Sequence, residues 1–298
     1  MSTLTNLSDS LASAVEKASA STLLVDGRKR YPASGIAYAP DLVLTADHVV
    51  TRDNEVRVLT PDGQTLPASL AGRDPGTDLA LLRLNENALQ PASLAKTDAK
   101  VGQLVLALGR PTPAGVQASW GIVTAIGGRV RTPRGGLLDE YLQTEATPYP
   151  GFSGGPLVDG EGATLGLNTS GLTPGSAITL PVKFAWRIAE SLAKHGSVKR
   201  GYLGVRTHVV EIPDDARQAL KRDQSTGLLV AWLDNGGPAQ TSGILVGDIL
   251  VAVAGQSVTD PDDLFVALDS GTVGKPVAVE ILRGGQPKTL NVTAGERK

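Results

Sequence analysis

A serine framed by glycines stands at residues 151–155, which read GFSGG. Ser153 is either a nucleophile held on a strained turn or an ordinary polar residue of a glycine-rich loop, since Ser-Gly pairs are common in loops. Nucleophilic catalysis by serine needs a general base, a carboxylate that orients the base, and backbone N–H donors for the developing oxyanion. The choice therefore depends on whether the rest of the chain supplies these groups.

The base can be assigned by elimination. The first 190 residues contain a single histidine, His48, near the end of the stretch LVLTADHVV. A lone histidine at a strand end is usually structural or exposed, so it becomes informative only in combination with a nucleophile. If a Ser–His pair exists in this part of the chain, His48 is its base.

Asp78 stands out among the carboxylates between His48 and Ser153. It precedes the apolar run LALLRL, which should enter a barrel core, so Asp78 is expected at the rim of that core and partly buried. A buried carboxylate is costly without a partner, and a histidine N–H is a suitable one. Asp74, in GRDPG, is more typical of a turn.

The glycines next to Ser153 also have a physical role. Gly151 and Gly154 allow backbone conformations that a Cβ would strain. A turn that directs the N–H groups of Gly151 and Ser153 at one point would form an oxyanion pocket. Pro156 then begins a strand that would anchor this turn.

Composition excludes several other functions. The 298 residues suggest two domains, and 41% hydrophobic with 19% charged residues indicates a folded protein. A net charge of −2 gives no electrostatic footprint for nucleic acid. The chain has no cysteine, and His48, His195 and His208 are far apart in sequence, so we expect neither a metal nor another cofactor. No phosphate-cradling GxxxxGK[ST] motif of an ATPase occurs.

The N-terminal stretch MSTLTNLSDSLASAVEKASAS lacks the basic start and apolar core of a signal peptide, and no run of about 18 apolar residues follows. These features predict a cytoplasmic protein without a membrane span. A periplasmic or other envelope location would require a targeting segment that this sequence does not include.

The order of the predicted elements indicates a mainly β protein. Residues 1–20 predict a helical segment. Residues 21–196 contain two sets of about six short strands, with turn signals roughly every 8–12 residues, which favours two small antiparallel barrels over an alternating βα fold. Residues 182–196 predict one helix that ends at Gly196. Residues 197–298 predict a separate α+β module.

Several segments together resemble the HtrA/Deg family of serine proteases, which have a chymotrypsin-like double β-barrel. They are SGIAYAPDLVLTADHVV, GTDLALLRL, VGQLVLALGRP, GIVTAIGG and LQTEATPYPGFSGGPLVDGEGATLGLNTSG, in the family's order, over about residues 20–190. The resemblance implies that His48 is the general base, Asp78 its orienting carboxylate and Ser153 the nucleophile. It also implies an oxyanion hole formed by the N–H groups of Gly151 and Ser153.

The stretch LNTSGL should line the pocket for the residue on the amino side of the scissile bond. This S1 assignment covers Asn168, Thr169, Ser170 and Gly171. The stretch carries no acidic residue that would attract Lys or Arg, so a small or medium apolar residue is expected there.

Three features depart from the family pattern. Phe152 stands where the family usually has Asn, so it either packs into the second barrel and holds the turn or biases the turn toward an inactive shape. Asp47 precedes His48 where the family often has a small or amide residue. Family trimers commonly form through an N-terminal segment with aromatic residues, and this chain has none before Tyr31, so a homotrimer is possible but follows less directly.

The stretches KRGYLGV and NGGPAQTSGILVGDILVAVAGQSV resemble a PDZ domain over about residues 200–295. Such domains bind a peptide end as an added strand at a sheet edge. The resemblance implies that the peptide carboxylate meets backbone N–H groups around Gly201, Tyr202, Leu203 and Gly204, beside a helix that presents Leu264, Phe265 and Leu268. The alternative is a unit that caps the protease and binds nothing.

Two functions are compatible with these patterns. The first is an ATP-independent serine endopeptidase that degrades unfolded or misfolded polypeptides through an acyl-enzyme, as in protein quality control. The alternative is a peptide-binding, chaperone-like protein on a protease scaffold, with weak or no catalysis because Phe152 distorts the oxyanion turn.

Overall fold

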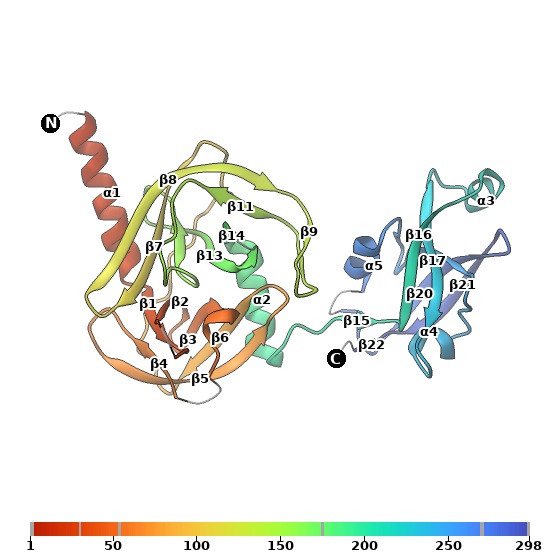
Figure 1. Ribbon diagram of the computed structural model, residues 1–298, viewed down its shortest axis with the longest axis horizontal. Helices are drawn as coiled ribbons and strands as arrows, with labels where there is room; N and C mark the ends of the chain where they lie inside the picture. Colours follow the sequence, from red (N-terminus) through yellow and green to blue (C-terminus); the bar gives the residue numbers. More distant parts are fainter. Residues whose placement is uncertain (1–2, 30, 53–54, 174–175, 269–270, 297–298) are drawn as a thin grey trace. The chain divides into compact units, whose positions relative to one another are not determined.

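The computed structural model describes residues 3–29, 31–52, 55–173, 176–268 and 271–296. The chain divides into two compact units, residues 1–198 and 199–298, coloured red to green and green to blue in Figure 1. The first unit holds two closed six-stranded barrels and two long helices, and the second holds a small sheet with short helices. The predicted mainly β fold with two barrels is therefore confirmed.

The first barrel closes in the order β1-β2-β3-β6-β5-β4, with every neighbouring pair antiparallel. Strand β3 is buried along its whole length because alternate side chains enter two different cores. Val43 packs inside the barrel, whereas Leu44 joins a cluster outside it. The strands are β1 (Thr22–Asp26), β2 (Ala33–Ala39), β3 (Leu42–Ala46), β4 (Val56–Leu59), β5 (Thr65–Asp74) and β6 (Leu79–Leu84). A short 3-10 helix, η1 (Asp47–Val49), follows β3.

The second barrel closes in the order β11-β14-β13-β12-β7-β8. Its core includes Val105, Val123, Leu142 and Leu157. The strands are β7 (Leu104–Thr112), β8 (Gly115–Gly127), β11 (Tyr141–Thr144), β12 (Pro156–Val158), β13 (Thr164–Thr173) and β14 (Ser176–Pro181). A small hairpin of β9 (Val130–Arg131) and β10 (Leu137–Leu138) is inserted between β8 and β11.

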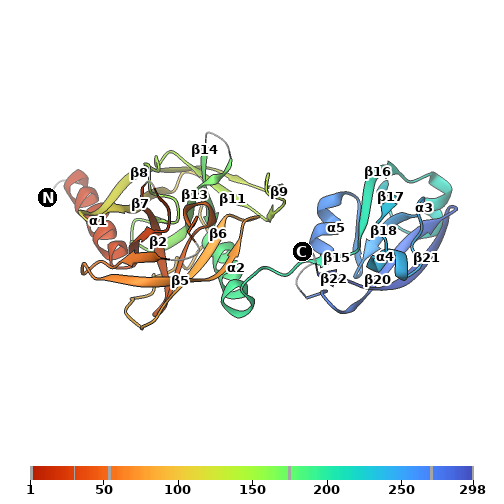
Figure 2. The same ribbon diagram turned by 60° about the horizontal axis from the view of Figure 1, so that its bottom comes forward.

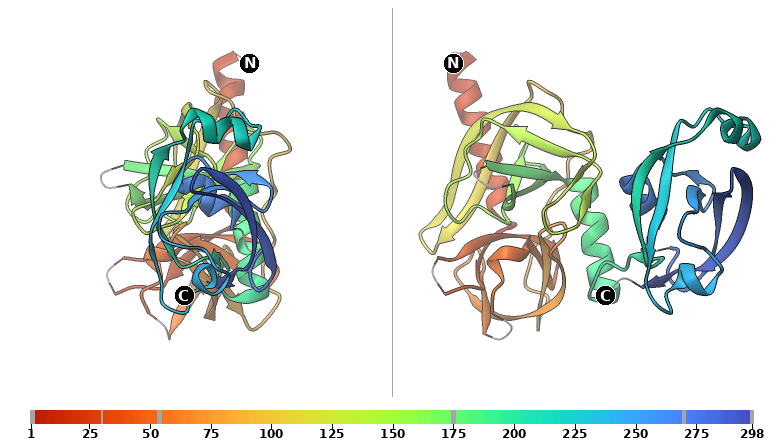
Figure 3. Two further views of the ribbon diagram at one scale, coloured as in Figure 1. Left: turned by 90° about the vertical axis from the view of Figure 1, so that its right-hand side faces the viewer. Right: turned by 45° about the vertical axis from the view of Figure 1, so that its right-hand side comes forward.

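Helix α2 (Val182–His195) joins the two barrels through one apolar cluster. Phe184, Ile188 and Leu192 form its buried stripe, and they pack with residues of both barrels, among them Leu44 and Leu167. Figures 1 and 3 show the helix running past both barrels. Gly196, at φ 72°, ends the helix, as a glycine in the left-handed region commonly does.

Helix α1 (Thr3–Ser19) packs against the second barrel. Ala14 and Ala18 are its buried residues and contact a cluster that includes Leu106, Leu108 and Val158. The helix lies within the stretch 1–20 for which a helical segment was predicted, and Leu4, near its start, is largely exposed.

The second unit is built on a sheet in the order β16-β17-β18-β20-β21, seen again in Figure 2. Its core includes Leu228, Val230, Leu250 and Ile281. The strands are β15 (Gly201–Tyr202), β16 (Val205–Glu211), β17 (Thr226–Leu233), β18 (Ile249–Val253), β19 (Gln256–Ser257), β20 (Pro276–Arg283), β21 (Gln286–Thr293) and β22 (Gly295–Glu296). The helices are α3 (Asp214–Leu220), α4 (Pro238–Thr241) and α5 (Pro261–Ala267). Strand β16 lies at an edge of this sheet.

Candidate active site

Two loops of the first barrel bring His48 and Asp78 together. His48 lies in η1, directly after β3, and Asp78 directly precedes β6. Because β3 pairs with β6 so that Ala46 is opposite Leu79, the two loops meet at one end of the barrel. His48 Nδ1 lies 2.8 Å from Asp78 Oδ2, and the backbone N–H of His48 donates to Asp78 Oδ1 at 2.9 Å. With Nδ1–H directed at the carboxylate, Nε2 is left to accept a proton.

Asp78 is more enclosed than its place at the start of a strand suggested. It is fully buried, and its φ of 55° lies in the left-handed region, which non-glycine residues rarely adopt. The hydroxyl of Thr169, from the second barrel, donates to Asp78 Oδ2. The N–H of Asp47 donates to the Asp78 carbonyl at 3.0 Å. The hydrogen bonds that the carboxylate accepts from His48 and Thr169 offset the cost of its burial, whereas Asp47 holds the backbone carbonyl of Asp78.

Ser153 lies in the second barrel, in the turn that leads into β12. Both neighbouring glycines have positive φ, 90° for Gly151 and 87° for Gly154. A Cβ on Gly154 would lie 2.1 Å from the carbonyl oxygen of Ser34, so the turn requires glycine there.

Ser34, on β2 of the first barrel, holds this turn in place. Its hydroxyl donates to the carbonyl of Gly151 at 2.7 Å, and its N–H donates to the carbonyl of Ser153 at 3.1 Å. Ser34 was not among the residues predicted from the sequence to form the site. A serine in the otherwise apolar strand ASGIAYA is the signal that could have indicated it.

The backbone N–H groups of the turn fall into two sets. Those of Phe152, Gly154 and Gly155 donate to the carbonyls of Tyr149, Asn168 and Phe152. Within the described residues, the N–H groups of Gly151 and Ser153 donate to no protein acceptor. Both residues line the same cleft as His48. Two unused donors on either side of Phe152 are what the binding of an oxyanion requires.

Phe152 packs into the second barrel. Its side chain is fully buried in the cluster that contains Val105 and Leu157. Its ring meets Tyr149 edge-on, with 5.5 Å between ring centroids. A Cβ on Gly109 would lie 2.5 Å from this ring, so the barrel wall is shaped to receive it. The buried Phe152 side chain therefore anchors the turn around Ser153 to the core of the second barrel.

One cleft is lined by most of the residues predicted to take part in catalysis or in substrate binding. Ser153 Oγ lies 3.1 Å from Ser170 Oγ there, and no hydrogen bond joins Ser153 to His48 in the described part of the chain. Partial burial lowers the pKa of Arg28, whose Nε donates to the Tyr31 carbonyl at 2.6 Å. The cleft is lined by Arg28, Tyr31, His48, Pro148, Tyr149, Pro150, Gly151, Ser153, Asn168, Thr169, Ser170 and Ala177.

Gly171 was also expected in the S1 pocket, but it packs against the His48–Asp78 pair. A Cβ at this position would lie 2.4 Å from Asp78 Oδ2 and 2.5 Å from His48 Nδ1. Gly171 is therefore a close neighbour of the pair and does not line the cleft.

Both units of the chain match known protein families. Residues 33–167 match the family described as "Trypsin-like peptidase domain", and residues 201–294 match "PDZ domain". The HtrA-type protease AlgW, solved with a tripeptide, is 30% identical with a TM-score of 0.78, covering 97% of each chain. The chain belongs to the HtrA family of serine proteases. The recognised resemblance and the chymotrypsin-like fold with a C-terminal PDZ domain are thereby confirmed.

Other serine endoproteases are similar over most of this chain. The serine endoprotease from Yersinia pestis has a TM-score of 0.78 at 27% identity, covering 97% of this chain and 98% of that one. A "probable periplasmic serine endoprotease DegP-like" of Brucella suis is 34% identical over 87% of this chain and 52% of its own length. The corresponding protein of Pseudomonas putida is 35% identical, over 88% and 55%. This HtrA chain thus spans about half the length of the curated relatives it matches.

Asp47, a departure from the usual HtrA pattern, is paired with arginines. It is buried, with one carboxylate oxygen 2.6 Å from Arg73 Nε and the other 3.4 Å from an Arg134 guanidinium nitrogen. Arg134 lies between β9 and β10, and the same nitrogen is 4.0 Å from Asp78 Oδ1. From the same hairpin, the Thr132 hydroxyl donates to the carbonyl of Gly76 at 2.7 Å. The second barrel therefore supports the turn that ends at Asp78, a contact that the sequence did not indicate.

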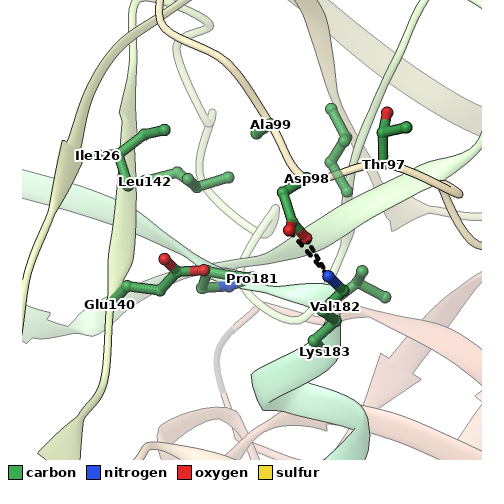
Figure 4. A pocket seen from close by; sticks show the side chains of 10 residues that line it. Thr97, Asp98, Ala99, Ile126, Glu140, Leu142, Pro181, Val182 and Lys183 are labelled. Carbon is green, nitrogen blue, oxygen red and sulfur yellow. Dashed lines mark hydrogen bonds and ion pairs between the residues drawn. The ribbon is translucent and has the colours of Figure 1, made fainter.

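A second pocket, in the second barrel near the start of α2, has no Ser–His pair among its lining residues. It is bordered by Ile126, Leu142 and Val182, and it includes none of the residues predicted to act. Figure 4 shows Lys183, at the start of α2, reaching Asp98 across this pocket, and the Nζ–Oδ1 distance is 2.7 Å. Both partners are largely exposed, so the ion pair contributes little to stability.

Neither a metal site nor a membrane-spanning helix is found where the structure can be described. No group of three or more His, Asp or Glu side chains there is arranged to hold a metal ion. Among the same residues, no helix combines the length and apolar character needed to cross a bilayer.

The PDZ residues expected to bind a peptide lie in two places, the stretch Gly201–Gly204 before β16 and the helix α5 with the residue that follows it. Within the described ranges, no hydrogen bond is donated by the N–H of Leu203 or Gly204. The N–H of Gly201 donates to the Leu268 carbonyl at 2.8 Å, which ties this loop to the end of α5. Leu268 is buried in the core, whereas Leu264 is only partly buried. The other two expected residues also have partners, since the Tyr202 hydroxyl donates to Asp234 and the Phe265 ring lies 5.4 Å from the Arg200 guanidinium.

Proposed function

We propose that this chain is a serine endopeptidase in which Ser153 is the nucleophile, His48 the general base and Asp78 the carboxylate that orients the base. The observation that carries the proposal is the double engagement of His48 by the buried Asp78, in the same cleft as a glycine-framed serine. The N–H groups of Gly151 and Ser153, which donate to no acceptor among the described residues, support the assignment of the oxyanion hole.

The reaction follows from these positions. Ser153 Oγ attacks the carbonyl carbon of the scissile bond while His48 Nε2 takes the hydroxyl proton. The N–H groups of Gly151 and Ser153 stabilise the oxyanion. His48 then donates its proton to the leaving amine nitrogen, the C–N bond breaks, and an acyl ester of Ser153 remains. Water attacks this ester with His48 again as the base, which releases the acid product and restores Ser153.

The cleft lining supports a small or medium apolar residue on the amino side of the scissile bond. Tyr149, Pro150 and Ala177 provide apolar surface, and the cleft includes no acidic residue within the described part of the chain. The guanidinium of Arg28 at the same cleft would repel a basic substrate residue.

The PDZ unit, in this proposal, binds the C-terminus of a peptide. The peptide would pair as a strand with the open edge of β16. Its terminal carboxylate would accept hydrogen bonds from the N–H groups of Leu203 and Gly204, which donate to no acceptor in the described ranges. The similar AlgW structures were solved with a decapeptide and a tripeptide, which agrees with peptide binding in this family.

Unfolded or misfolded polypeptides are the proposed substrates, and quality control the proposed role. Relatives named as periplasmic endoproteases support this class of activity. Their names do not support the cytoplasmic location expected from the N-terminal sequence, and they favour the envelope alternative. Fractionation of cells that produce the native protein distinguishes the two locations.

Digestion of unfolded casein by the full chain tests the proposed activity. Wild type should cleave it, and Ser153→Ala should lose about 10⁴-fold or more in rate, as other proteases do when the nucleophile is removed. Ser69→Ala, at an exposed position on β5, is the matched control and should cleave like wild type. Equal cleavage by Ser153→Ala would refute the assignment. A wild type that prevents aggregation without cleaving would favour the chaperone-like alternative.

A further inference from the structure

We propose that Ser170 is a positioning residue that restrains the nucleophile, because its hydroxyl holds the Ser153 hydroxyl away from His48 in the resting protein. The proposal rests on the function proposed above. It adds a residue whose role is to set how readily Ser153 reacts, beyond its expected place in the S1 pocket.

The hydroxyl groups of the two serines are hydrogen-bonded. Ser153 Oγ and Ser170 Oγ are 3.1 Å apart, and no bond between Ser153 and His48 is present in the described ranges. Both serines line the cleft that also contains His48. The resting contact of the nucleophile is therefore with Ser170.

The local structure explains why Ser170 faces the cleft. Strand β13 is buried from Thr164 to Thr169, and Ser170 is the first exposed residue. The pairing of β13 with β14 shifts register between Thr169 and Thr173, so Ser170 lies where the regular ladder is interrupted. Its side chain is thus committed to neither barrel core and is available to the cleft.

The backbone on both sides of this contact is fixed. The carbonyl of Ser153 accepts the N–H of Ser34, and the N–H of Gly154 donates to Asn168. Next to Ser170, the Thr169 hydroxyl donates to Asp78 and accepts the N–H of Gly171. Ser153 can therefore change partners by rotating its side chain, without a rearrangement of the turn.

The chemistry makes this contact a competing one. A serine hydroxyl has one proton, and in the attack that proton must pass to His48 Nε2. If Ser153 donates to Ser170, the proton is directed away from the base. If Ser170 donates to Ser153, it occupies a lone pair of the attacking oxygen. A neutral hydrogen bond of this kind shifts the equilibrium between the bonded and the free hydroxyl by about two- to tenfold. Loss of the bond should therefore speed acylation of Ser153 by a similar factor.

The test compares Ser170→Thr with Ser170→Val in the full chain. These variants have nearly the same shape, and Thr keeps the hydroxyl. The readout is the rate at which a small fluorophosphonate modifies Ser153, followed by intact mass at one pH. Ser170→Val and Ser170→Ala should react about two- to tenfold faster than wild type, and Ser170→Thr within about twofold of it. Equal rates for Thr and Val, or slower labelling without the hydroxyl, would overturn the proposal.

Two further readouts separate this inference from its alternatives. A purely structural role for Ser170 would lower the thermal midpoint and slow labelling, whereas the restraint predicts faster labelling at an unchanged midpoint. If wild type and all Ser170 variants fail to react, the proposed function itself fails. If wild type reacts and the variants match it, only the role of Ser170 fails.

Discussion

The hydroxyl of Thr169 donates a hydrogen bond to Oδ2 of Asp78, the same carboxylate oxygen that faces His48 Nδ1. Thr169 lies on β13 of the second barrel, and Asp78 lies directly before β6 in the first. The second barrel therefore fixes the carboxylate that orients the base, so that the geometry of the pair depends on the contact between the barrels.

Replacing Thr169 by Val should slow cleavage. The change removes a hydrogen bond to a charged group, which contributes about 1.5–3 kcal/mol, so the rate of casein cleavage should fall about 10- to 100-fold. Thr169→Ser keeps the hydroxyl and should remain within a few-fold of wild type. If the Val and Ser variants cleave equally fast, the hydroxyl does not hold Asp78 in the way described.

Gly171→Ala should inactivate the protein without unfolding it. The added Cβ would lie 2.4 Å from Asp78 Oδ2 and 2.5 Å from His48 Nδ1, so the pair must separate. A displacement of about 1 Å at a catalytic group can cost about 100-fold in rate, and a loss of that order is expected. Gly160→Ala, where a Cβ would meet nothing within 4 Å, is the control and should keep full activity. An active Gly171→Ala variant with an unchanged thermal midpoint would contradict the predicted contact.

Phe152 should matter chiefly for stability of the turn. Truncation to Ala removes a fully buried ring from the second barrel, and such truncations cost about 3–5 kcal/mol. Phe152→Asn, which restores the usual family residue, should also destabilise, because it buries an amide in an apolar cluster. Phe152→Leu is the milder control. Denaturant unfolding of the full chain measures each change, and a cost below about 1 kcal/mol for the Ala variant would show that the ring does not anchor the turn.

The PDZ unit should lose stability in acid through Asp248. Burial alone would raise the pKa of this carboxyl, but hydrogen bonds from Arg283 and from the N–H of Leu245 together hold the pKa below its usual range. A lowered pKa in the folded state means that the stabilisation is complete above the ordinary pKa of about 3.9 and is lost as pH falls through the folded value. Stability at neutral pH should therefore include this contribution, and stability at a pH below the folded-state pKa of Asp248 should not.

Amide hydrogen exchange in β18 and β20 can measure this effect in the full chain. Asp248→Asn should speed exchange there at pH 7, equivalent to a loss of about 1.5–3 kcal/mol, and the difference from wild type should shrink as pH falls below about 4. Asp214→Asn, whose carboxylate pairs with Arg217 at an exposed site, should change little at any pH. A pH-independent difference for Asp248→Asn would contradict the assigned cause.

Much of the fold could be predicted because it depends on local patterns. The short strands between turn signals indicated two six-stranded barrels, and the spacing of Phe184, Ile188 and Leu192 indicated α2. Residue types alone also identified Ser153, His48 and Asp78 as candidates, since few other groups could complete a serine site.

The contacts that hold the site could not be predicted in the same way. Ser34 and Gly151 are 117 residues apart, and Thr169 and Asp78 are 91 apart. Such pairs depend on which strands become neighbours when the barrels close. Strand neighbours cannot be predicted from a local sequence pattern. For the same reason Gly171 was expected in the S1 pocket, although it packs against the His48–Asp78 pair.

The most direct test of the central claim is peptide mapping by mass spectrometry after reaction of the full chain with a fluorophosphonate. We predict one adduct per chain, on Ser153, and little or no adduct in His48→Ala, because without the base the hydroxyl is a weak nucleophile. A folded wild-type chain that stays unmodified, or that carries its adduct on another residue, would contradict the assignment of Ser153 as the nucleophile.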